Sequence, residues 1–224
     1  MSNKIYFISG IDTDSGKTFA TGLLAKSLLD KGKTVITQKL AQTGCTDISL
    51  DIIMHREIMG IGLQDVDRAK ITCPYCFSLP ASPHLAARLE GKQIDIDIIN
   101  QNSIILLSQY EYVLLEGAGG LMVPINDKLL TIDFIKQQHY PLILVSSAKI
   151  GSINHTLLSI EACFNREIEL SGIIFNEFPK VNEEIENDSR NIIRNKLKDS
   201  YPLAFFTNVP IINNNYSIKI NIPI

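Results

Sequence analysis

A glycine-rich segment near the start of the chain, GIDTDSGKT (residues 10–18), constrains the fold more than any other feature of the sequence. It follows a strand-like apolar run, KIYFIS, and precedes a segment whose apolar residues have helical spacing. A strand, a glycine-rich turn and a helix in this order form a phosphate-binding loop, in which free backbone N–H groups and the helix N-terminus bind anions. The sequence therefore predicts a nucleotide site in this segment.

The loop departs from the usual spacing, because five residues rather than four separate Gly10 from Gly16. Ile11 stands where the first glycine of the common pattern belongs, so we expect the loop to begin along a different path. Within it, Lys17 is expected to reach the β- and γ-phosphates, and Thr18 to bind Mg²⁺. A chance G-K-T in a turn is disfavoured by the strand before it and the helix after it.

Short apolar runs alternate with longer amphipathic segments along the whole chain. The runs are nearly continuously apolar, as expected of strands buried on both faces of a parallel sheet. They are KIYFIS (4–9), TVITQK (34–39), YVLLEG (112–117), PLILVSS (141–147) and SGIIFN (171–176). This alternation predicts one α/β domain over residues 1–224, with a single doubly wound, mostly parallel sheet flanked by helices, of the P-loop nucleoside triphosphatase type.

Composition limits the partners and the compartment. The chain has 21 Lys and Arg against 24 Asp and Glu, for a formal charge of −3. It has no basic stretch of the kind that contacts successive phosphates of a nucleic acid. No apolar run approaches the roughly 18 residues that cross a bilayer. The start, MSNKIYFISG, lacks the apolar region of a signal peptide. We therefore expect a soluble cytoplasmic protein with no nucleic-acid or membrane partner.

The four cysteines include one C-x-x-C pair, Cys73 and Cys76, which could suggest a metal or redox site. A zinc site needs a second pair at suitable spacing, and neither Cys45 nor Cys163 supplies one. The sequence favours structural cysteines.

Charged residues stand where predicted strands end. Lys39 closes the second strand and can bring a positive charge to the γ-phosphate, although a solvated lysine fits the position equally well. Glu116 ends a very apolar strand before a glycine cluster that begins at Gly117, which favours a Mg²⁺ ligand over a surface acid. Asp51 or Asp47 would supply a further carboxylate, and position alone does not choose between them.

A second anion site is predicted in KIGSINHTLLSIEA (149–162), where a helix begins just after a strand. Ser152 or Asn154 is expected to cap this helix. His155 is expected to be packed or capping rather than catalytic, because it has no acid or nucleophile in an obvious partner position.

Several of these segments together resemble the dethiobiotin synthetases. They are GIDTDSGKT, QKLAQTG, CPYCFSLPASPHLAA, LLEGAGGLMVPI and AKIGSINHTLL, in the family's order and at similar spacing from about Lys4 to Pro210. The loop of that family commonly reads G-T-D-T-[DE]-x-G-K-T, so the additional residue between Gly10 and Gly16 is itself a family trait.

This sequence also departs from the family pattern. Ile11 replaces the usual Thr, Leu40 replaces a Pro, and Gln42 and Thr43 stand where Ala and Ser are common. None of these changes removes a charged group. The tail, residues 211–224, has no match.

The resemblance implies an ATP-dependent cyclo-ligase of biotin biosynthesis. Such an enzyme carboxylates 7,8-diaminononanoate with CO₂ and closes the ring to give dethiobiotin, ADP and phosphate, through a carbamate and a carbamic-phosphoric anhydride. The resemblance further implies Mg²⁺ as cofactor and a homodimer with shared active sites.

The resemblance also implies roles for individual residues. Lys17 and Lys39 would be the catalytic cations. ATP would contact Asp14, Ser15, Gly16, Lys17, Thr18, Phe19, Glu116, Gly117, Asn176 and Pro210. The substrate would contact Thr13, Lys39 and Thr43 at its amines and, from the other subunit, Gly151, Ser152 and Asn154 at its carboxylate. Mg²⁺ would be held by Thr18, Asp51 and Glu116.

Partitioning and septum-positioning ATPases are the alternative class, since they share this sheet and a glycine-rich loop. Their loop has a signature lysine five residues before the invariant lysine, and here that position is Asp12. An acid cannot neutralise a γ-phosphate, so the sequence disfavours this class. A nucleotide-binding module without turnover is disfavoured by the charged strand ends.

Overall fold

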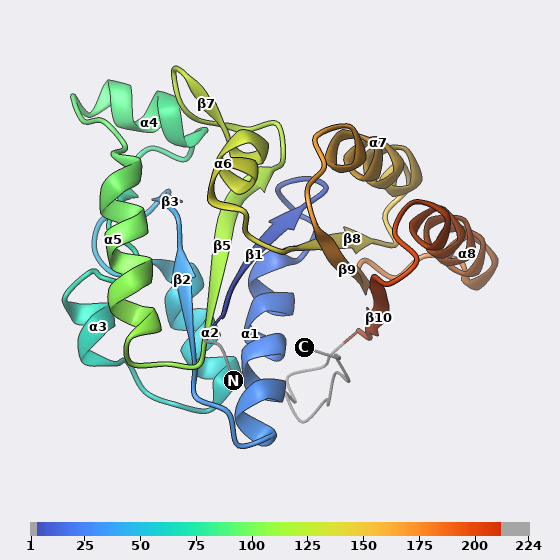
Figure 1. The fold of residues 1–224 in the computed structure, drawn as a ribbon, viewed down its shortest axis with the longest axis horizontal. Helices are drawn as coiled ribbons and strands as arrows, with labels where there is room; N and C mark the ends of the chain where they lie inside the picture. The colour runs from blue at the N-terminus through green and yellow to red at the C-terminus, as the bar shows by residue number, and fades with distance from the viewer. Residues whose placement is uncertain (1–3, 212–224) are drawn as a thin grey trace.

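A sheet of six parallel strands forms the centre of the computed structural model, which describes residues 4–211 (Figure 1). Its strand order is β10-β9-β8-β1-β5-β2. The strands are β1 (Lys4–Gly10), β2 (Val35–Lys39), β5 (Tyr112–Gly120), β8 (Leu142–Ser147), β9 (Leu170–Asn176) and β10 (Phe205–Val209). The five predicted strands are confirmed. The unmatched tail lies outside the described residues from position 212 onward.

The edge strand β10 was not predicted. Four of its five residues are only half-buried, so it lacks the continuous apolar run that identifies the inner strands. It pairs in parallel with β9, which brings Val209 opposite Asn176.

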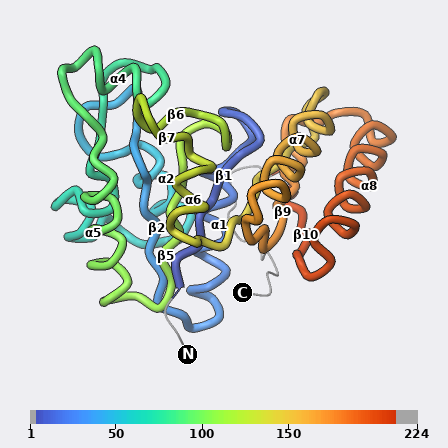
Figure 2. The backbone as a smooth tube through the Cα atoms, turned by 45° about the horizontal axis from the view of Figure 1, so that its top comes forward, coloured from blue at the N-terminus to red at the C-terminus, as the bar shows by residue number. Residues whose placement is uncertain are grey.

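Helices cover both faces of the sheet, which confirms the doubly wound fold. On one face α1 (Lys17–Asp30) and α2 (Leu50–Met59) bury residues such as Leu24 and Ile58 against Ile8. The other face is covered around Phe7 by four helices. They are α5 (Ile96–Leu107), α6 (Thr131–Gln138), α7 (Ser152–Asn165) and α8 (Glu183–Ser200). Figure 2 shows α7 and α8 side by side at the β10 end of the sheet, away from α5.

Shorter elements follow the carboxyl ends of β2 and β5. The parallel pair β3 (Gln42–Thr43) and β4 (Cys76–Phe77) comes after β2, and the antiparallel pair β6 (Pro124–Asn126) and β7 (Leu129–Leu130) comes after β5. The remaining short helices are α3 (Asp65–Arg68) and α4 (Pro83–Leu89). The added elements enlarge the edge of the sheet at which ligands bind in folds of this class.

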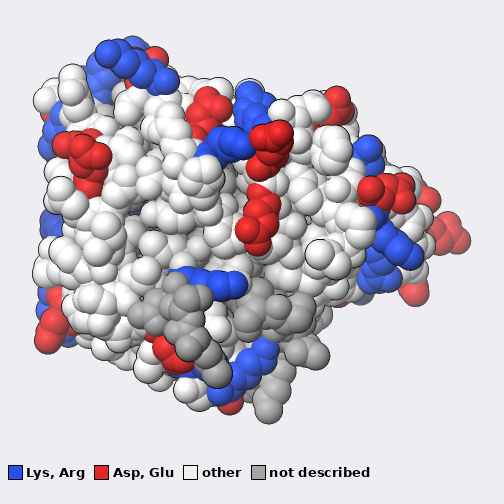
Figure 3. Space-filling view, viewed as in Figure 1, with Lys and Arg blue, Asp and Glu red and all other residues white. Residues whose placement is uncertain are grey.

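Charges of both signs are interspersed among the described residues on the face drawn in Figure 3. Within residues 4–211, every helix is too short or too polar to cross a bilayer.

Candidate functional site

The glycine-rich loop joins β1 to α1 and is closed by hydrogen bonds to its own backbone. Lys17 Nζ donates to the carbonyl oxygens of Asp12 at 2.8 Å and Thr13 at 3.1 Å. The Ser15 hydroxyl also donates to the Asp12 carbonyl, at 3.1 Å. Gly16 begins the helix with a φ of 88°, in the left-handed region that favours glycine. The loop thus holds the buried Lys17 ammonium directly against the chain at the N-terminus of α1.

The additional loop residue continues the pairing of β1. Ile11 N donates to the carbonyl of Val145 on β8 at 3.0 Å, one step beyond the ladder that ends with Gly10 opposite Val145. The chain therefore turns one residue later than in a loop with four residues between its glycines.

A buried ion cluster stands beside the loop, at the end of β2 and in the middle of β5. Glu116 does not end its strand as the sequence predicted, because β5 continues through the glycines to Gly120. In the parallel register Lys39 lies opposite Glu116, and Lys39 Nζ is 2.8 Å from Glu116 Oε1. The same ammonium is 2.5 Å from Asp51 Oδ2 and donates to the Gly117 carbonyl at 3.0 Å. Lys39 is only 4% exposed, so the alternative of a solvated lysine is wrong.

Thr18 connects the loop to this cluster. Its hydroxyl is 3.0 Å from Asp51 Oδ1 and 3.4 Å from Glu116 Oε1. Asp47, the other candidate, has a side chain that is 84% exposed and lies 3.8 Å from Lys70. The structure therefore brings Asp51, and not Asp47, to the site.

The start of α2 explains why Asp51 points into the site. Ser49 caps this helix, its hydroxyl accepting from Ile52 N. Gln42 on β3 accepts from the Ser49 hydroxyl at 2.8 Å and from Asp51 N at 3.3 Å. These contacts tie the first turn of α2 to the chain that leaves β2.

The donor atoms of this cluster fit a hard divalent cation. Two carboxylates and one hydroxyl offer oxygen ligands, which suits Mg²⁺ bound by one or two carboxylates together with phosphate oxygens and water. Within the described residues, no group of three His, Cys, Asp or Glu side chains forms a self-sufficient metal site. A metal here would depend on ligands that the protein does not supply.

The charges of the cluster stabilise one another. Burial opposes a charged Lys39, but Glu116 and Asp51 outweigh it and hold the pKa of that lysine above its usual range. Burial likewise opposes a charged Glu116, while Lys39 and His55 hold its pKa well below the usual range. Lys17 differs, because burial, followed by repulsion from Lys39, lowers its pKa to about 8. Lys39 therefore carries a permanent charge, whereas the charge of Lys17 depends on pH near neutrality.

Asn176 and Pro210 lie together at the ends of β9 and β10, next to the loop. Asn176 Nδ2 donates to the Ser15 carbonyl at 3.2 Å, and its Oδ1 accepts from Phe178 N at 3.1 Å. A Cβ on Gly16 would lie 2.2 Å from Asn176 Nδ2. Pro210 directly follows Val209, whose carbonyl accepts from Glu177 N at 2.9 Å.

The other residues expected to contact the nucleotide and the substrate amines differ in how far they are buried. Thr13 and Asp14 are exposed in the loop, and Thr43 is half-buried on β3. Phe19 is partly buried and packs against the core on the α1 face. Gly117 is needed by the packing, because a Cβ there would lie 2.9 Å from the Phe7 ring.

The capping prediction for α7 is wrong. Gly151, with a φ of 94°, takes the cap position, and no side chain caps the helix. Ser152 is the first helical residue, and its hydroxyl lies 2.9 Å from that of Ser147. Asn154 and His155 are exposed, so the expectation of a packed or capping His155 is also wrong.

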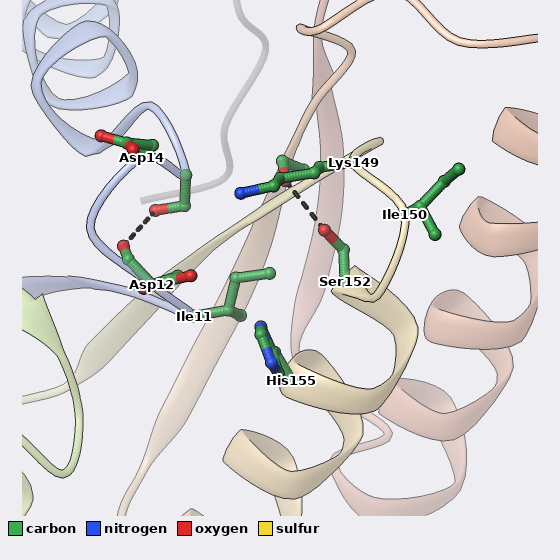
Figure 4. A pocket seen from close by; sticks show the side chains of 9 residues that line it. Ile11, Asp12, Asp14, Lys149, Ile150, Ser152 and His155 are labelled. Atoms are coloured by element: carbon green, nitrogen blue, oxygen red, sulfur yellow. Dashed lines mark hydrogen bonds between the residues drawn. The ribbon is translucent and has the colours of Figure 1, made fainter.

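The start of α7 lies beside the glycine-rich loop within the same chain. A cavity of about 30 Å³ separates them, with Asp12 and Asp14 on one side and Ser152 and His155 on the other (Figure 4). A larger cleft of about 410 Å³ adjoins it. Its lining includes Thr13, Gly120, Leu121, Met122, Val123, His155 and Leu158. The two predicted anion sites are therefore neighbours.

Sequence reasoning missed His55. Its side chain is fully buried, and Nε2 lies 3.0 Å from Glu116 Oε2. A signal was present, because His55 follows Asp51 by four residues and so shares its face of a helix.

The cysteines are all free thiols in the described chain. Cys73 Sγ and Cys76 Sγ are 3.9 Å apart, and burial raises the pKa of Cys45 to about 11. The Cys45 thiol is therefore largely protonated at neutral pH, which lowers its reactivity.

Comparison with known proteins identifies the family. A family model described as an AAA domain matches residues 4–213. The ATP-dependent dethiobiotin synthetase BioD 2 of Haemophilus ducreyi is 52% identical to this chain, over 91% of this chain and 96% of its own length. The chain belongs to the dethiobiotin synthetase family. A second family member, from Chlorobaculum tepidum, is 48% identical over 88% of this chain and 83% of its own length.

Solved structures of other proteins share the fold of this dethiobiotin synthetase family member. A ParA family ATPase from Chlorobium tepidum has a TM-score of 0.56 at 13% identity, covering 95% of this chain and 87% of its own. The signal recognition particle receptor FtsY from Elizabethkingia anophelis has a TM-score of 0.51 at 13% identity, covering 96% of this chain and 61% of its own. At this identity the likeness concerns the fold alone.

The lowered pKa of Lys17 predicts that nucleotide binding takes up a proton in mildly alkaline solution. Above its pKa of about 8 the free protein holds a largely neutral Lys17, whereas phosphate oxygens favour the charged form. ATP affinity should therefore fall by up to about tenfold per pH unit above that value. Calorimetric titration with ATP in two buffers of different ionisation enthalpy measures the uptake. Lys39 adds nothing to it, because its pKa is raised; absence of net uptake between about pH 8 and 9 would contradict the prediction.

Proposed function

We propose that this protein is a cytoplasmic ATP-dependent dethiobiotin synthetase, which converts 7,8-diaminononanoate, CO₂ and ATP into dethiobiotin, ADP and phosphate. The observation that carries the proposal is the cluster of Lys39, Asp51 and Glu116 beside a phosphate-binding loop, in a chain 52% identical to a protein of that name. Phosphoryl transfer depends mainly on positioning and charge neutralisation, and this cluster is suited to both.

The reaction proceeds in three steps that balance without any other reactant. One amine of the substrate attacks CO₂ and loses a proton, which gives a carbamate. A carbamate oxygen then attacks the γ-phosphorus of ATP, and ADP leaves. The second amine attacks the carbonyl carbon of the resulting mixed anhydride and loses a proton, a C–N bond forms, and the bond to phosphate breaks, so that phosphate leaves as the ureido ring closes.

Two lysines would neutralise the oxygens that gain charge. Lys17 would exchange its backbone partners, the carbonyls of Asp12 and Thr13, for the β- and γ-phosphate oxygens. Lys39 keeps its charge and lies at the end of β2, where it would bind the γ-phosphate and the carbamate. Backbone N–H groups from Asp14 to Phe19 would surround the phosphates, as the N-terminus of a helix favours.

The acids and the hydroxyl of the cluster would hold Mg²⁺. Thr18, Asp51 and Glu116 supply its protein ligands, and the ion would neutralise charge on the phosphates when bound. Lys39 limits the freedom of both carboxylates, because one ammonium contacts them together.

The remaining contacts concern the two ends of the ligands. Asn176, Gly117 and Pro210 would border the nucleotide, and Thr13 and Thr43 the diamine. The substrate carboxylate would bind Gly151, Ser152 and Asn154 of a second subunit.

Exposed apolar side chains support a homodimer. Met122 is 55% exposed and Leu158 57%, and both line the cleft beside the loop. Ile150, just before α7, is 79% exposed and borders the smaller cavity (Figure 4). A second copy of the chain would cover these side chains.

A partitioning-type ATPase is the weaker alternative. The solved ParA family ATPase shares the fold at 13% identity, which supports nothing beyond the fold. Asp12 occupies the loop position that carries a lysine in that class.

The reaction predicts that phosphate release requires both the diamine and CO₂, because the attacking oxygen belongs to the carbamate. The measurement is phosphate release with ATP and Mg²⁺, with each of the diamine and bicarbonate omitted in turn. Rates should fall to background in both omissions. Equal release without the diamine would contradict the proposed reaction and favour the switch class.

Replacement of Lys39 should lower turnover by about 10²-fold or more, which is the usual effect of removing one preorganised electrostatic group. Lys39→Met keeps much of the buried volume but leaves Glu116 and Asp51 without their shared cation. Steady-state turnover measures the effect, with ATP binding as a check that the variant is folded. The control is Lys92→Met, because Lys92 is exposed and contacts Glu90 and the Phe77 ring away from the ion cluster. Near-normal turnover of Lys39→Met would show that Lys39 has no catalytic role.

Shared active sites predict that two inactive variants complement each other. If each site pairs Lys17 of one chain with Asn154 of the other, Lys17→Ala and Asn154→Ala homodimers should both be poor. Mixed dimers then carry one site with both changes and one with neither, so activity after random exchange should recover to about a quarter of the parent's.

The same experiment tests the arrangement within one chain. The start of α7 also borders the loop of its own chain across the smaller cavity. If confirmed subunit exchange gave only the average of the two parent activities, Asn154 would serve its own chain or bind no substrate.

A further inference from the structure

A chain of fully buried polar side chains runs behind the ion cluster and has no part in the reaction as described above. It connects Thr37 on β2 with His55 and Arg56 on α2, and Arg56 with Asp67 on α3. None of these four side chains is more than 2% exposed. Burying so many polar groups is unfavourable unless each is hydrogen-bonded, so their arrangement needs an explanation.

The far end of the chain is anchored by an ion pair. Arg56 donates to both carboxylate oxygens of Asp67, from Nε at 2.9 Å and from Nη2 at 2.8 Å. Asp67 also accepts from Gln64 N and from the Thr72 hydroxyl. A two-point contact of this kind fixes the plane of the guanidinium group.

The guanidinium group in turn fixes the direction of the Thr37 hydroxyl. Arg56 Nη1 lies 2.7 Å from Thr37 Oγ1, and arginine can only donate. The hydroxyl oxygen therefore accepts from Arg56, and its own proton is free for the other neighbour. That neighbour is His55 Nδ1, at 3.0 Å.

This direction determines the tautomer of His55. With Nδ1 accepting from Thr37, the ring proton is on Nε2, which lies 3.0 Å from Glu116 Oε2. The opposite tautomer would place two lone pairs against each other at that contact, because Glu116 is ionised beside Lys39. Every polar atom in the chain from Asp67 to Glu116 then has a partner of the correct kind.

We propose that Arg56, Thr37 and His55 form a relay of hydrogen bonds that orients Glu116 for the metal, with His55 as the positioning residue. The relay occupies Oε2 of the carboxylate and leaves Oε1 facing Thr18 and Lys39. Glu116 consequently presents a single oxygen to Mg²⁺. The inference rests on the proposed function for the identity of the metal, but not for the hydrogen bonds.

The first test measures the tautomer in the protein without nucleotide or metal. The chain has four histidines, and NMR of protein labelled with ¹⁵N in histidine distinguishes the two ring nitrogens. The His55 signals are those that vanish in His55→Gln. We expect a neutral ring protonated on Nε2. A ring protonated on Nδ1, alone or together with Nε2, would overturn the relay.

The second test measures Mg²⁺ binding to the complex of the protein with a non-hydrolysable ATP analogue, by calorimetry. His55→Met removes the donor to Glu116 at similar volume, and the Mg²⁺ concentration for half-saturation should rise about 10- to 100-fold. His55→Gln retains an N–H donor and should restore most of the affinity. Thr37→Val, which removes the hydroxyl that orients the ring, should raise the requirement in the same direction.

The control is Thr21→Val. Thr21 is a buried threonine of α1 whose hydroxyl has no hydrogen-bond partner within the described residues, and its removal should leave Mg²⁺ binding at the parent level. Thermal unfolding and binding of the analogue without Mg²⁺ check that each variant is folded.

The outcomes separate the relay from its alternatives. Folded His55→Met with unchanged Mg²⁺ affinity, or equal losses in the Met and Gln variants, would reduce His55 to a packing residue. Should the parent protein release no diamine-dependent phosphate, the proposed function fails. The tautomer of His55 and the affinity of Mg²⁺ for the complex with the ATP analogue would still test the relay.

Discussion

The pairing of Lys39 with Glu116 is the interaction on which the rest of the site depends. Each charge is buried, and removing an unpaired charge from water costs several kcal/mol, so each residue offsets the cost of burying the other. The parallel register of β2 and β5 sets them opposite each other, and Asp51 and Thr18 then reach the same point from α2 and α1. The sheet thus provides both the position of the charges and the low-dielectric surroundings that strengthen them.

Much of this arrangement could be predicted from the sequence, because it follows from local patterns. The inner strands are continuous apolar runs, the loop is bounded by a strand and a helix, and Lys39 ends its strand while Glu116 directly precedes the glycines of β5. The edge strand β10 was missed because its half-exposed residues lack that pattern. A polar side chain was expected to cap α7, whereas Gly151 occupies the cap position in the left-handed region and no side chain caps the helix.

Other parts of the site depend on contacts between distant segments, which no local pattern contains. Asp51 and Asp47 are equivalent by position in the sequence, and contacts of Asp51 with the distant Thr18 and Lys39 distinguish them. His55 shares a helix face with Asp51, and Thr37 shares a strand face with Lys39. These spacings indicate which side chains point the same way, but the meeting of the two faces at Glu116 requires the tertiary structure.

The distances along the chain between these partners bear on how the protein folds. Lys17 finds its carbonyl partners five and four residues away, so these contacts of the loop are local in sequence. Lys39 and Glu116 are 77 residues apart, and Thr18 and Glu116 are 98 apart, so their contacts must wait until long segments have been brought together. Closing such long loops is slow, because the chain loses entropy before the contacts between strands form and compensate for it. The lysine contacts within the loop are thus local in sequence, whereas the contacts that orient a metal exist only when β5 lies between β1 and β2.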